Sequence, residues 1–279
     1  MEQNPLRQYF RQPAVFVRLP SQGRYYPDGA LDRNPDNEYP VLPMTTMDEV
    51  TYRTPDALFN GAAVVSVIES CVPNIRDAWS IPTLDIDPIL VAIRIASYGH
   101  EMQVSTKCPA CDTESDYALD LRKVLDRIPA GNYDETMTLG DLCIHFRPMD
   151  YRDINDNSLQ QFEEQKLLQN LESNDSVDEQ EKLRLLGDAL KKITAMTTKA
   201  LAKSIRLIET PDARVDQREH ITEWLDNCDR AVFQQVREHI ITTKQVSEIK
   251  PLDIKCTNCA HEYQQNYTLD LSNFFEYAS

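Results

Sequence analysis

Lys107-Cys108-Pro109-Ala110-Cys111 and Lys255-Cys256-Thr257-Asn258-Cys259 are two copies of a Lys-Cys-x-x-Cys motif, separated by about 145 residues. A similar strand-like stretch follows each copy, Tyr117–Leu121 after the first and Tyr267–Leu271 after the second. The repeated flank predicts two equivalent β-hairpins, each of which presents its cysteines from a tight turn. Four thiolates in two such pairs are the ligand set of a closed, tetrahedral structural zinc site. We therefore expect one shared zinc ion with the ligands Cys108, Cys111, Cys256 and Cys259.

Two alternatives to this shared site stay open, namely two reduced cysteine pairs without metal and a redox-active pair. Redox chemistry is disfavoured because neither motif begins a predicted helix, where a thiolate would be activated. Four cysteine ligands leave no open coordination position, so we expect a structural metal, either zinc or iron. His261, two residues after Cys259, could replace a ligand if one cysteine is not used.

The composition is typical of a globular chain, and three of its cysteines lie outside the two motifs. Its 279 residues are 41% hydrophobic, which is enough for one large core or two smaller ones. The chain has no long apolar run, and its polar N-terminus has no secretory signal, so we expect neither a membrane span nor export. Seven cysteines is an odd number, and Cys71, Cys143 and Cys228 are isolated. This pattern favours folding in a reducing cytoplasm over a disulfide framework.

The formal net charge of −16 restricts the partners that the chain can bind. Proteins that bind nucleic acid or anionic membranes need a cationic surface, and the lysines near Lys191–Lys203 are sparse and interleaved with apolar residues. We therefore expect neither nucleic acid nor membrane as a partner. Basic surfaces of other proteins remain compatible with this charge.

The sequence divides into four parts, and the predicted fold class is α+β. Residues 1–50 are rich in proline and predict an extended arm of short strands and loops with little core of its own. Residues 51–150 predict a pair of helices followed by the first Cys-x-x-Cys hairpin. Residues 151–245 predict a predominantly helical insertion. Residues 246–279 predict the second hairpin and an aromatic tail, which pack with 100–125 as zinc-ribbon-like paired β-hairpins.

Several helix boundaries can be predicted before the insertion. Thr54-Pro55 predicts the start of a buried helix that ends near Cys71, and Asp87-Pro88 predicts the start of a core helix that stops near Gly99. Asp85 and Asp87 are thereby interpreted as a turn residue and a helix cap, not as a general acid/base pair. Strand signals at 137–139 and 142–147 predict a hairpin around Gly140-Asp141.

The insertion is expected to form a bundle of four helices. The first spans 154–171, and Ser176–Glu179 is a capping box that begins the second. Asp216–Glu219 is a capping box of the same type and begins the third helix. The fourth spans 231–241. No glycine-rich phosphate loop, nucleophile elbow or zinc-protease motif occurs, so we expect no enzymatic activity.

Phrases in the first part of the chain resemble a known family. They are Asn4-Pro5-Leu6, Tyr9–Pro13, Arg18–Pro27, Pro43-Met44-Thr45, Arg53–Leu58, Ser70–Ile75 and Ala92–Gly99. This combination resembles a baseplate hub protein of T-even-like contractile-tailed bacteriophages, over roughly residues 4–125 and the terminal motif. The resemblance implies a non-enzymatic role in building the central hub of the tail baseplate, with other hub and tail proteins as partners. It also implies assembly in the host bacterial cytoplasm and a final place in the virion tail.

Two rival functions accompany this interpretation. One is an assembly chaperone of the same phage system that is absent from the finished virion, and the other is a zinc-ribbon transcription regulator. If the chain is a hub protein, we expect the arm and the insertion to carry partner contacts while the zinc site fixes their geometry. Deletion of residues 1–20 should then abolish incorporation without unfolding the core.

Overall fold

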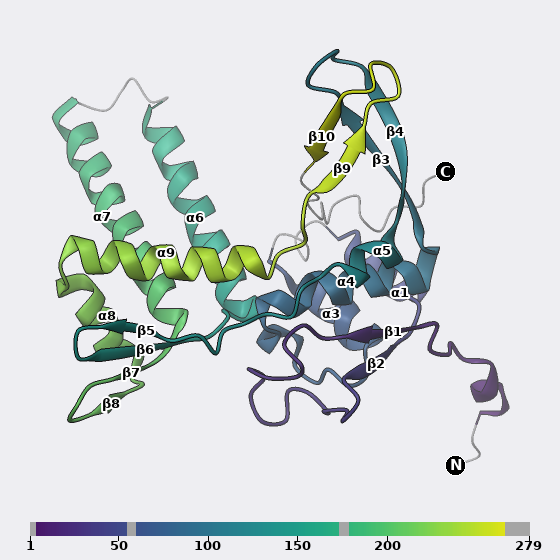
Figure 1. The fold of residues 1–279 in the computed structure, drawn as a ribbon, viewed down its shortest axis with the longest axis horizontal. Helices are drawn as coiled ribbons and strands as arrows, with labels where there is room; N and C mark the ends of the chain where they lie inside the picture. The colour runs from purple at the N-terminus through teal and green to yellow at the C-terminus, as the bar shows by residue number, and fades with distance from the viewer. Residues whose placement is uncertain (1–3, 55–59, 173–178, 266–279) are drawn as a thin grey trace. The chain divides into compact units, whose positions relative to one another are not determined.

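The computed structural model describes residues 4–54, 60–172 and 179–265, which belong to two units (Figure 1). Unit 1 takes in residues 1–131 and 247–279, and unit 2 takes in residues 132–246. Both units combine helices with small antiparallel sheets, which confirms the predicted α+β class.

Helix α4 (Thr83–Tyr98) forms the centre of unit 1, and its buried residues run from Leu84 to Arg94. It ends at Gly99, whose φ of 88° supplies the predicted C-terminal stop. The predicted start at Asp87-Pro88 was wrong, because the helix begins one turn earlier, after Pro82. Pro88 is the sixth residue of the helix, where its missing N–H removes the hydrogen bond to the Leu84 carbonyl.

Among the described residues of unit 1, two α-helices precede α4. Helix α1 (Thr46–Tyr52), which the sequence did not predict, begins with a capping box formed by Thr45 and Asp48. Helix α3 (Ala62–Cys71) begins after Gly61, and its apolar face packs on α4 as expected. The predicted helix start at Thr54-Pro55 falls on residues 55–59, which lie outside the described part of the chain.

The N-terminal arm is more firmly anchored than its composition predicts. A 3-10 turn, η1 (Pro5–Tyr9), precedes strands β1 (Val15–Arg18) and β2 (Glu38–Val41), which pair antiparallel. The two strands lie on α4 of the same chain. Val17, Tyr39 and Val41 of the strands, and Leu19 just after β1, are at most 2% exposed. Alternate residues of both strands face α4, so the buried side chains of the arm join the core around that helix.

Asp85 fastens the arm to α4 from inside the core. Its carboxylate is fully buried and accepts hydrogen bonds from the Ser21 N–H at 2.8 Å and the Tyr26 hydroxyl at 3.0 Å. Burial raises the pKa of Asp85 to about 6, against the opposing effect of these hydrogen bonds. The interpretation of Asp85 and Asp87 as turn and cap was wrong, since both lie within α4.

Unit 1 is completed by short elements and two hairpins. The short elements are η2 (Ala78–Ser80) and α5 (Leu121–Asp126). The first hairpin consists of β3 (Glu101–Lys107) and β4 (Glu114–Asp120). The second consists of β9 (Leu252–Lys255) and β10 (Glu262–Gln265).

Unit 2 is built on a four-stranded antiparallel sheet in the order β5-β6-β7-β8. The predicted hairpin is present as β5 (Met137–Leu139) and β6 (Leu142–Phe146). Strands β7 (Ile205–Glu209) and β8 (Arg214–Val215) continue the sheet, and the sequence did not predict them. The insertion is therefore not a helical bundle alone.

The four expected helices of unit 2 are all present. They are α6 (Tyr151–Glu172), α7 (Glu179–Lys203), α8 (Arg218–Asn227) and α9 (Arg230–Val246). The prediction of a capping box at Asp216 was wrong, because α8 begins after Gln217 and has no side-chain cap. Most of the Ser176–Glu179 box lies in 173–178, outside the described residues.

Candidate metal centre

The turn between β3 and β4 presents the first cysteine pair. The last strand pair is Lys107 with Glu114, and the Cys108 N–H donates to the Thr113 carbonyl at 3.0 Å. The Asp112 N–H then donates to the Cys108 carbonyl at 2.9 Å, with Asp112 in the left-handed region at a φ of 55°. The chain thereby curls back on itself, and both cysteines lie within one tight turn.

The turn between β9 and β10 repeats this geometry. Its last strand pair is Lys255 with Glu262, and the Cys256 N–H donates to the His261 carbonyl at 2.9 Å. The Ala260 N–H donates to the Cys256 carbonyl at 3.0 Å, with a φ of 58° at Ala260. The two predicted hairpins are present and share one turn type, although Tyr267–Leu271 of the repeated flank lies outside the described residues.

The two turns bring all four motif cysteines together. Cys108 Sγ lies 3.7 Å from Cys259 Sγ, and Cys111 Sγ lies 3.7 Å from Cys256 Sγ. All four sulfur atoms lie within 4.8 Å of one another, and the cysteines are free thiols. Sulfurs at the corners of a tetrahedron around zinc, with Zn–S bonds of about 2.3 Å, are about 3.8 Å apart. The donor set and its spacing therefore fit a tetrahedral metal ion.

Polar contacts between the hairpins hold the two turns in place beside the sulfurs. The Asn258 amide donates to Thr113 Oγ1 at 3.0 Å, and Ser115 Oγ lies 3.1 Å from Thr257 Oγ1. Farther along the strands, the Thr106 hydroxyl donates to Gln265 Oε1 at 3.1 Å. The hairpins are thus oriented by contacts on both sides of the cluster, and Figure 1 shows them side by side.

The turns also favour thiolates, which are the form that binds metal. Hydrogen bonds with the side chain and backbone of Thr113 lower the pKa of Cys111 to about 6. The backbone amides of Cys259 and Asn258 lower the pKa of Cys256. Neither cysteine begins a helix, so in this protein the turn amides supply the stabilisation that a helix N-terminus would give.

The pKa of Cys259 shifts in the opposite direction. A backbone hydrogen bond with His261 lowers its pKa, but the hydrogen bonds that it shares with Cys111 and its other cysteine neighbours, together with desolvation, raise the value to about 12. Adjacent thiolates repel one another, so a divalent cation would be needed for all four to ionise. His261 is not among the clustered donors, and its ring faces Tyr263.

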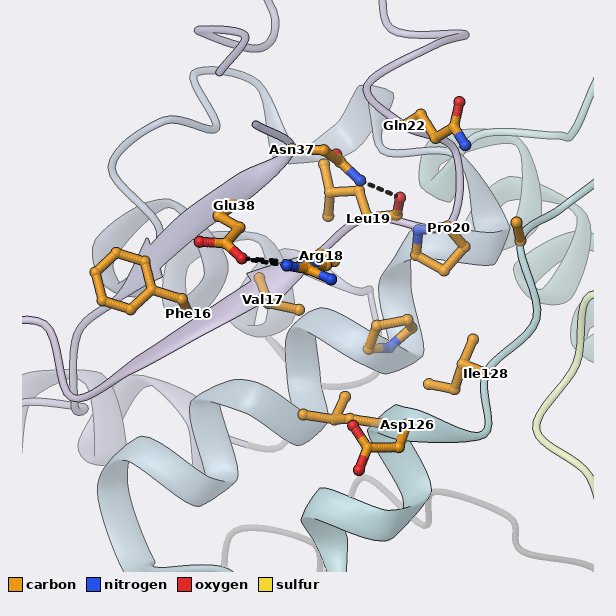
Figure 2. A pocket seen from close by; sticks show the side chains of 13 residues that line it. Phe16, Val17, Arg18, Leu19, Pro20, Gln22, Asn37, Glu38, Asp126 and Ile128 are labelled. Atoms are coloured by element: carbon orange, nitrogen blue, oxygen red, sulfur yellow. Dashed lines mark hydrogen bonds and ion pairs between the residues drawn. The ribbon is translucent and has the colours of Figure 1, made fainter. Parts of the chain in front are cut away.

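A groove of about 490 Å³ lies elsewhere on unit 1, between the β1–β2 pair and the segment after α5 (Figure 2). The ionisable side chains that line it are Arg18, Glu38 and Asp126, and Arg18 is paired with Glu38 at 2.6 Å. The lining contains no histidine, cysteine or lysine.

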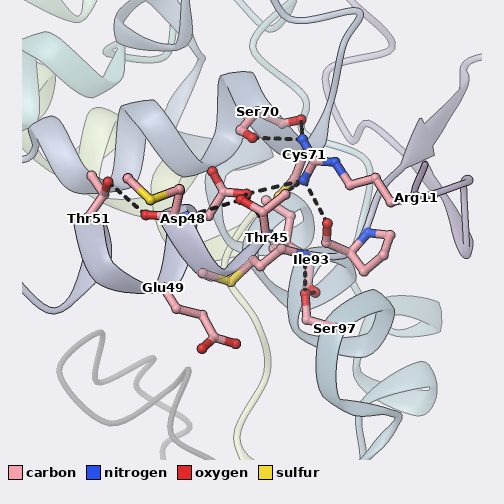
Figure 3. Close-up of polar contacts among 12 residues, drawn as sticks. Arg11, Thr45, Asp48, Glu49, Thr51, Ser70, Cys71, Ile93 and Ser97 are labelled. Carbon is pink, nitrogen blue, oxygen red and sulfur yellow. Dashed lines mark hydrogen bonds and ion pairs between the residues drawn. The ribbon is translucent and has the colours of Figure 1, made fainter. Parts of the chain in front are cut away.

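Arg11 fixes the base of the exposed N-terminal segment (Figure 3). Its guanidinium donates to four oxygen acceptors and one sulfur, namely the Pro43 carbonyl at 2.7 Å, Asp48 Oδ2 at 3.2 Å, the Ser70 carbonyl at 2.7 Å, Ser70 Oγ at 2.8 Å and Cys71 Sγ at 3.8 Å. Burial alone would raise the pKa of Asp48, but hydrogen bonds from Thr45 and Ser70 and the charge of Arg11 hold it below its usual range. One arginine thus connects the arm with both α1 and α3.

A family model described as T4 bacteriophage base plate protein matches residues 37–276. The chain belongs to this family. This baseplate protein is accordingly a structural protein of a T4-like phage tail, and its place in the virion tail implies contacts with other tail proteins. The match covers the helical insertion and the phrases between Pro43 and Gly99, whereas the phrases between Asn4 and Pro27 precede it.

Two other comparisons and one structural finding complete the description of the baseplate protein. No curated protein matches the chain, and no solved structure does. In the part of the chain that the structure describes, every helix is too short or too polar to span a membrane.

Sequence reasoning missed a second cluster of metal-binding side chains. Cys143, His145 and Glu209 present donor atoms within 4.8 Å of one another in unit 2. The sequence analysis interpreted Cys143 as isolated and gave His145 no role. The signal that could have revealed them is the pairing of β6 with β7, which requires β7 to be recognised as a strand.

Proposed function

We propose that this baseplate protein is a structural subunit of the central hub, acts through protein–protein contacts, and has no enzymatic activity. The observation that carries the proposal is the concentration of exposed apolar side chains near the N-terminus of a baseplate-family chain. A baseplate subunit must bury surface against its neighbours, and exposed apolar surface is typical of such contacts.

The exposed apolar side chains define a candidate contact surface, which we call the arm surface. Its members are Leu6 (62% exposed), Tyr9 (77%), Phe10 (55%), Phe16 (61%), Met47 (70%) and Val50 (57%). The first three are on or next to η1, and the last two are on α1. Because Arg11 bonds to Asp48 of α1, the segment that carries Phe10 is held next to that helix. The arm surface is thus presented by an anchored segment.

The four-cysteine cluster has a structural role in this proposal. A zinc ion bound by Cys108, Cys111, Cys256 and Cys259 would join the β3–β4 hairpin to the β9–β10 hairpin and so close unit 1 around its two chain segments. The all-cysteine ligand set supports a structural ion over a catalytic one.

Quantitative mass spectrometry of purified particles and of isolated hub intermediates tests the proposal. The phage would carry either the wild-type chain or the triple variant Leu6→Ser, Tyr9→Ser, Phe10→Ser. Gln8→Ala, at an exposed polar position of the same turn, is the matched control. We expect stoichiometric wild-type and control chains in finished hubs and strong depletion of the triple variant.

The other outcomes separate the rival functions. Wild-type chain in intermediates but not in particles would identify an assembly chaperone and overturn the hub role. Absence of the chain from both particles and intermediates would overturn the hub role and favour the zinc-ribbon regulator. Normal incorporation of the triple variant would show that the arm surface is not the contact.

The structure changes the truncation that should be used. Removal of residues 1–20 would delete β1 together with the buried Val17 and Leu19, so we expect that truncation to destabilise the core as well as to remove the contact surface. Removal of residues 1–10 keeps Arg11 and both strands. The shorter deletion is therefore the one that separates contact from folding.

A further inference from the structure

Three donor side chains converge on one face of the unit 2 sheet. Cys143 of β6 lies directly opposite Glu209 of β7 in the strand register. His145 is two residues after Cys143, so its side chain points to the same face of the sheet. The result is a sulfur, an imidazole nitrogen and a carboxylate oxygen that approach one another from two neighbouring strands.

The distances among these donors are close to those around a tetrahedral zinc ion. Cys143 Sγ lies 3.8 Å from His145 Nε2, and His145 Nε2 lies 3.4 Å from Glu209 Oε2. Zinc bonds of about 2.3 Å to sulfur and about 2.05 Å to nitrogen and oxygen would place these pairs about 3.6 Å and about 3.3 Å apart. Small side-chain adjustments would therefore suffice to accommodate the ion.

The geometry also distinguishes a metal site from a nucleophile activated by a base. In a Cys-His-Glu catalytic triad, the thiol and the carboxylate contact different nitrogens of the imidazole. In this cluster Cys143 and Glu209 both contact Nε2. Convergence of all three groups on one point suits a shared cation and does not suit a proton relay.

Accessibility and orientation favour a bound ion as well. The side chains of His145 and Glu209 are 21% and 34% exposed, so an ion can reach them from solvent. Arg214 Nη2 contacts Glu209 Oε1 at 2.6 Å, which fixes the carboxylate while Oε2 faces the histidine. An outer partner that orients a ligating carboxylate in this way is a regular feature of metal sites.

We propose that Cys143, His145 and Glu209 form a second zinc site, distinct from the four-cysteine cluster and located in unit 2. The three protein ligands occupy three corners of a tetrahedron, and a water molecule occupies the fourth. Bound zinc crosslinks β6 to β7. The site does not depend on the hub role, because its ligands take no part in the arm surface.

Metal analysis of the purified full-length chain tests this proposal. We expect two zinc ions per wild-type chain, and one in each of the variants Cys143→Ser and His145→Gln. Cys228→Ser and His220→Gln are matched controls, because they change the same residue types in unit 2 outside the cluster, and both should retain two. A wild-type chain with one zinc that His145→Gln does not lower would overturn the proposal.

Cobalt substitution keeps the test decisive if a variant folds poorly. In Cys256→Ser, which disables the four-cysteine cluster, Co²⁺ should give the visible spectrum of a tetrahedral site with a single thiolate ligand. That spectrum should disappear when His145→Gln is added. Absence of any cobalt spectrum in Cys256→Ser would overturn the second site. One zinc that His145→Gln removes and Cys256→Ser retains would instead refute the four-cysteine site alone.

Discussion

The sulfur of Cys108 lies 3.7 Å from the sulfur of Cys259, and the sulfur of Cys111 lies equally far from that of Cys256. The first cysteine of each turn thus meets the second cysteine of the other turn. This reciprocal arrangement accompanies two turns with the same hydrogen bonds and the same left-handed residue, at Asp112 and at Ala260. Such pairing places two sulfurs from each turn around a common centre.

Cys256→Ser should remove the zinc ion of the four-cysteine cluster and destabilise unit 1. Structural zinc contributes on the order of 10 kcal/mol of binding free energy in small domains, so the loss should lower the free energy of unfolding by several kcal/mol. Metal analysis and thermal unfolding measure the two effects together. Cys228→Ser is the control, since its thiol bonds only to the Leu225 carbonyl among the hydrogen bonds described for it. Unchanged zinc content in Cys256→Ser would contradict a metal role for this cluster.

Arg11→Lys should destabilise unit 1 although it preserves the charge. A lysine ammonium cannot reach the Pro43, Asp48 and Ser70 acceptors at once, and each lost charge-assisted bond costs roughly 1–3 kcal/mol. Arg18→Lys is the control, because Arg18 is 76% exposed and forms a surface pair with Glu38. Urea unfolding of the two variants should show a clear loss of stability for Arg11 and almost none for Arg18. An equal loss of stability in the two variants would show that the multiple hydrogen bonds of the Arg11 guanidinium do not stabilise unit 1.

Asp85 should make the stability of unit 1 depend on pH. Burial raises the folded-state pKa to about 6 from an ordinary value of 3.8, so the folded state binds more protons than the unfolded state between these values. Stability should therefore decrease as the pH rises from about 4 to about 6, by roughly 3 kcal/mol, and then level off. Asp85→Asn cannot ionise and should lack this decrease. Urea unfolding of both proteins from pH 4 to pH 7 provides the comparison, and parallel curves would rule out the assignment.

Neighbouring residues of β1 and the loop after it should differ sharply in their effect on stability. Leu19 is 2% exposed, and Leu19→Ala should cost about 2–5 kcal/mol through lost burial and the cavity that remains. Phe16 is 61% exposed, and Phe16→Ala should change the free energy of unfolding by less than about 1 kcal/mol. Among chains that fold, Phe16→Ala should reduce incorporation into hubs more than Leu19→Ala does. A destabilised Phe16→Ala chain would mean that this side chain packs against its own core.

The hairpins and most helices could be predicted from the sequence because their signals are local. A Cys-x-x-Cys turn between short strands specifies its own geometry, and Gly99 marks the end of α4 by its left-handed φ. Pro88 misled the prediction because a proline near the start of a helix is compatible with more than one starting residue. The sequence pattern alone does not choose between them.

Long-range relationships could not be predicted in the same way. Strand β7 is short and follows α7 almost directly, so Ile205–Glu209 resembles a continuation of the helix. Without β7 there was no basis for placing Glu209 opposite Cys143, and the second cluster stayed hidden. The role of Arg11 was also invisible, because its acceptors on α1 and α3 lie up to 59 residues away.

The order of the two Cys-x-x-Cys turns along the chain has a consequence for synthesis. Cys111 and Cys256 are 145 residues apart, and the whole of unit 2 is encoded between them. At about 5–20 residues per second, the first cysteine pair leaves the ribosome on the order of ten seconds before its counterpart. During that interval the first cysteine pair lacks the other two ligands, and unit 2 can fold before they are synthesised. Closure of unit 1 therefore follows the synthesis of the whole of unit 2, and a chain that has not yet been extended to Cys259 displays the first pair of thiols without its counterpart.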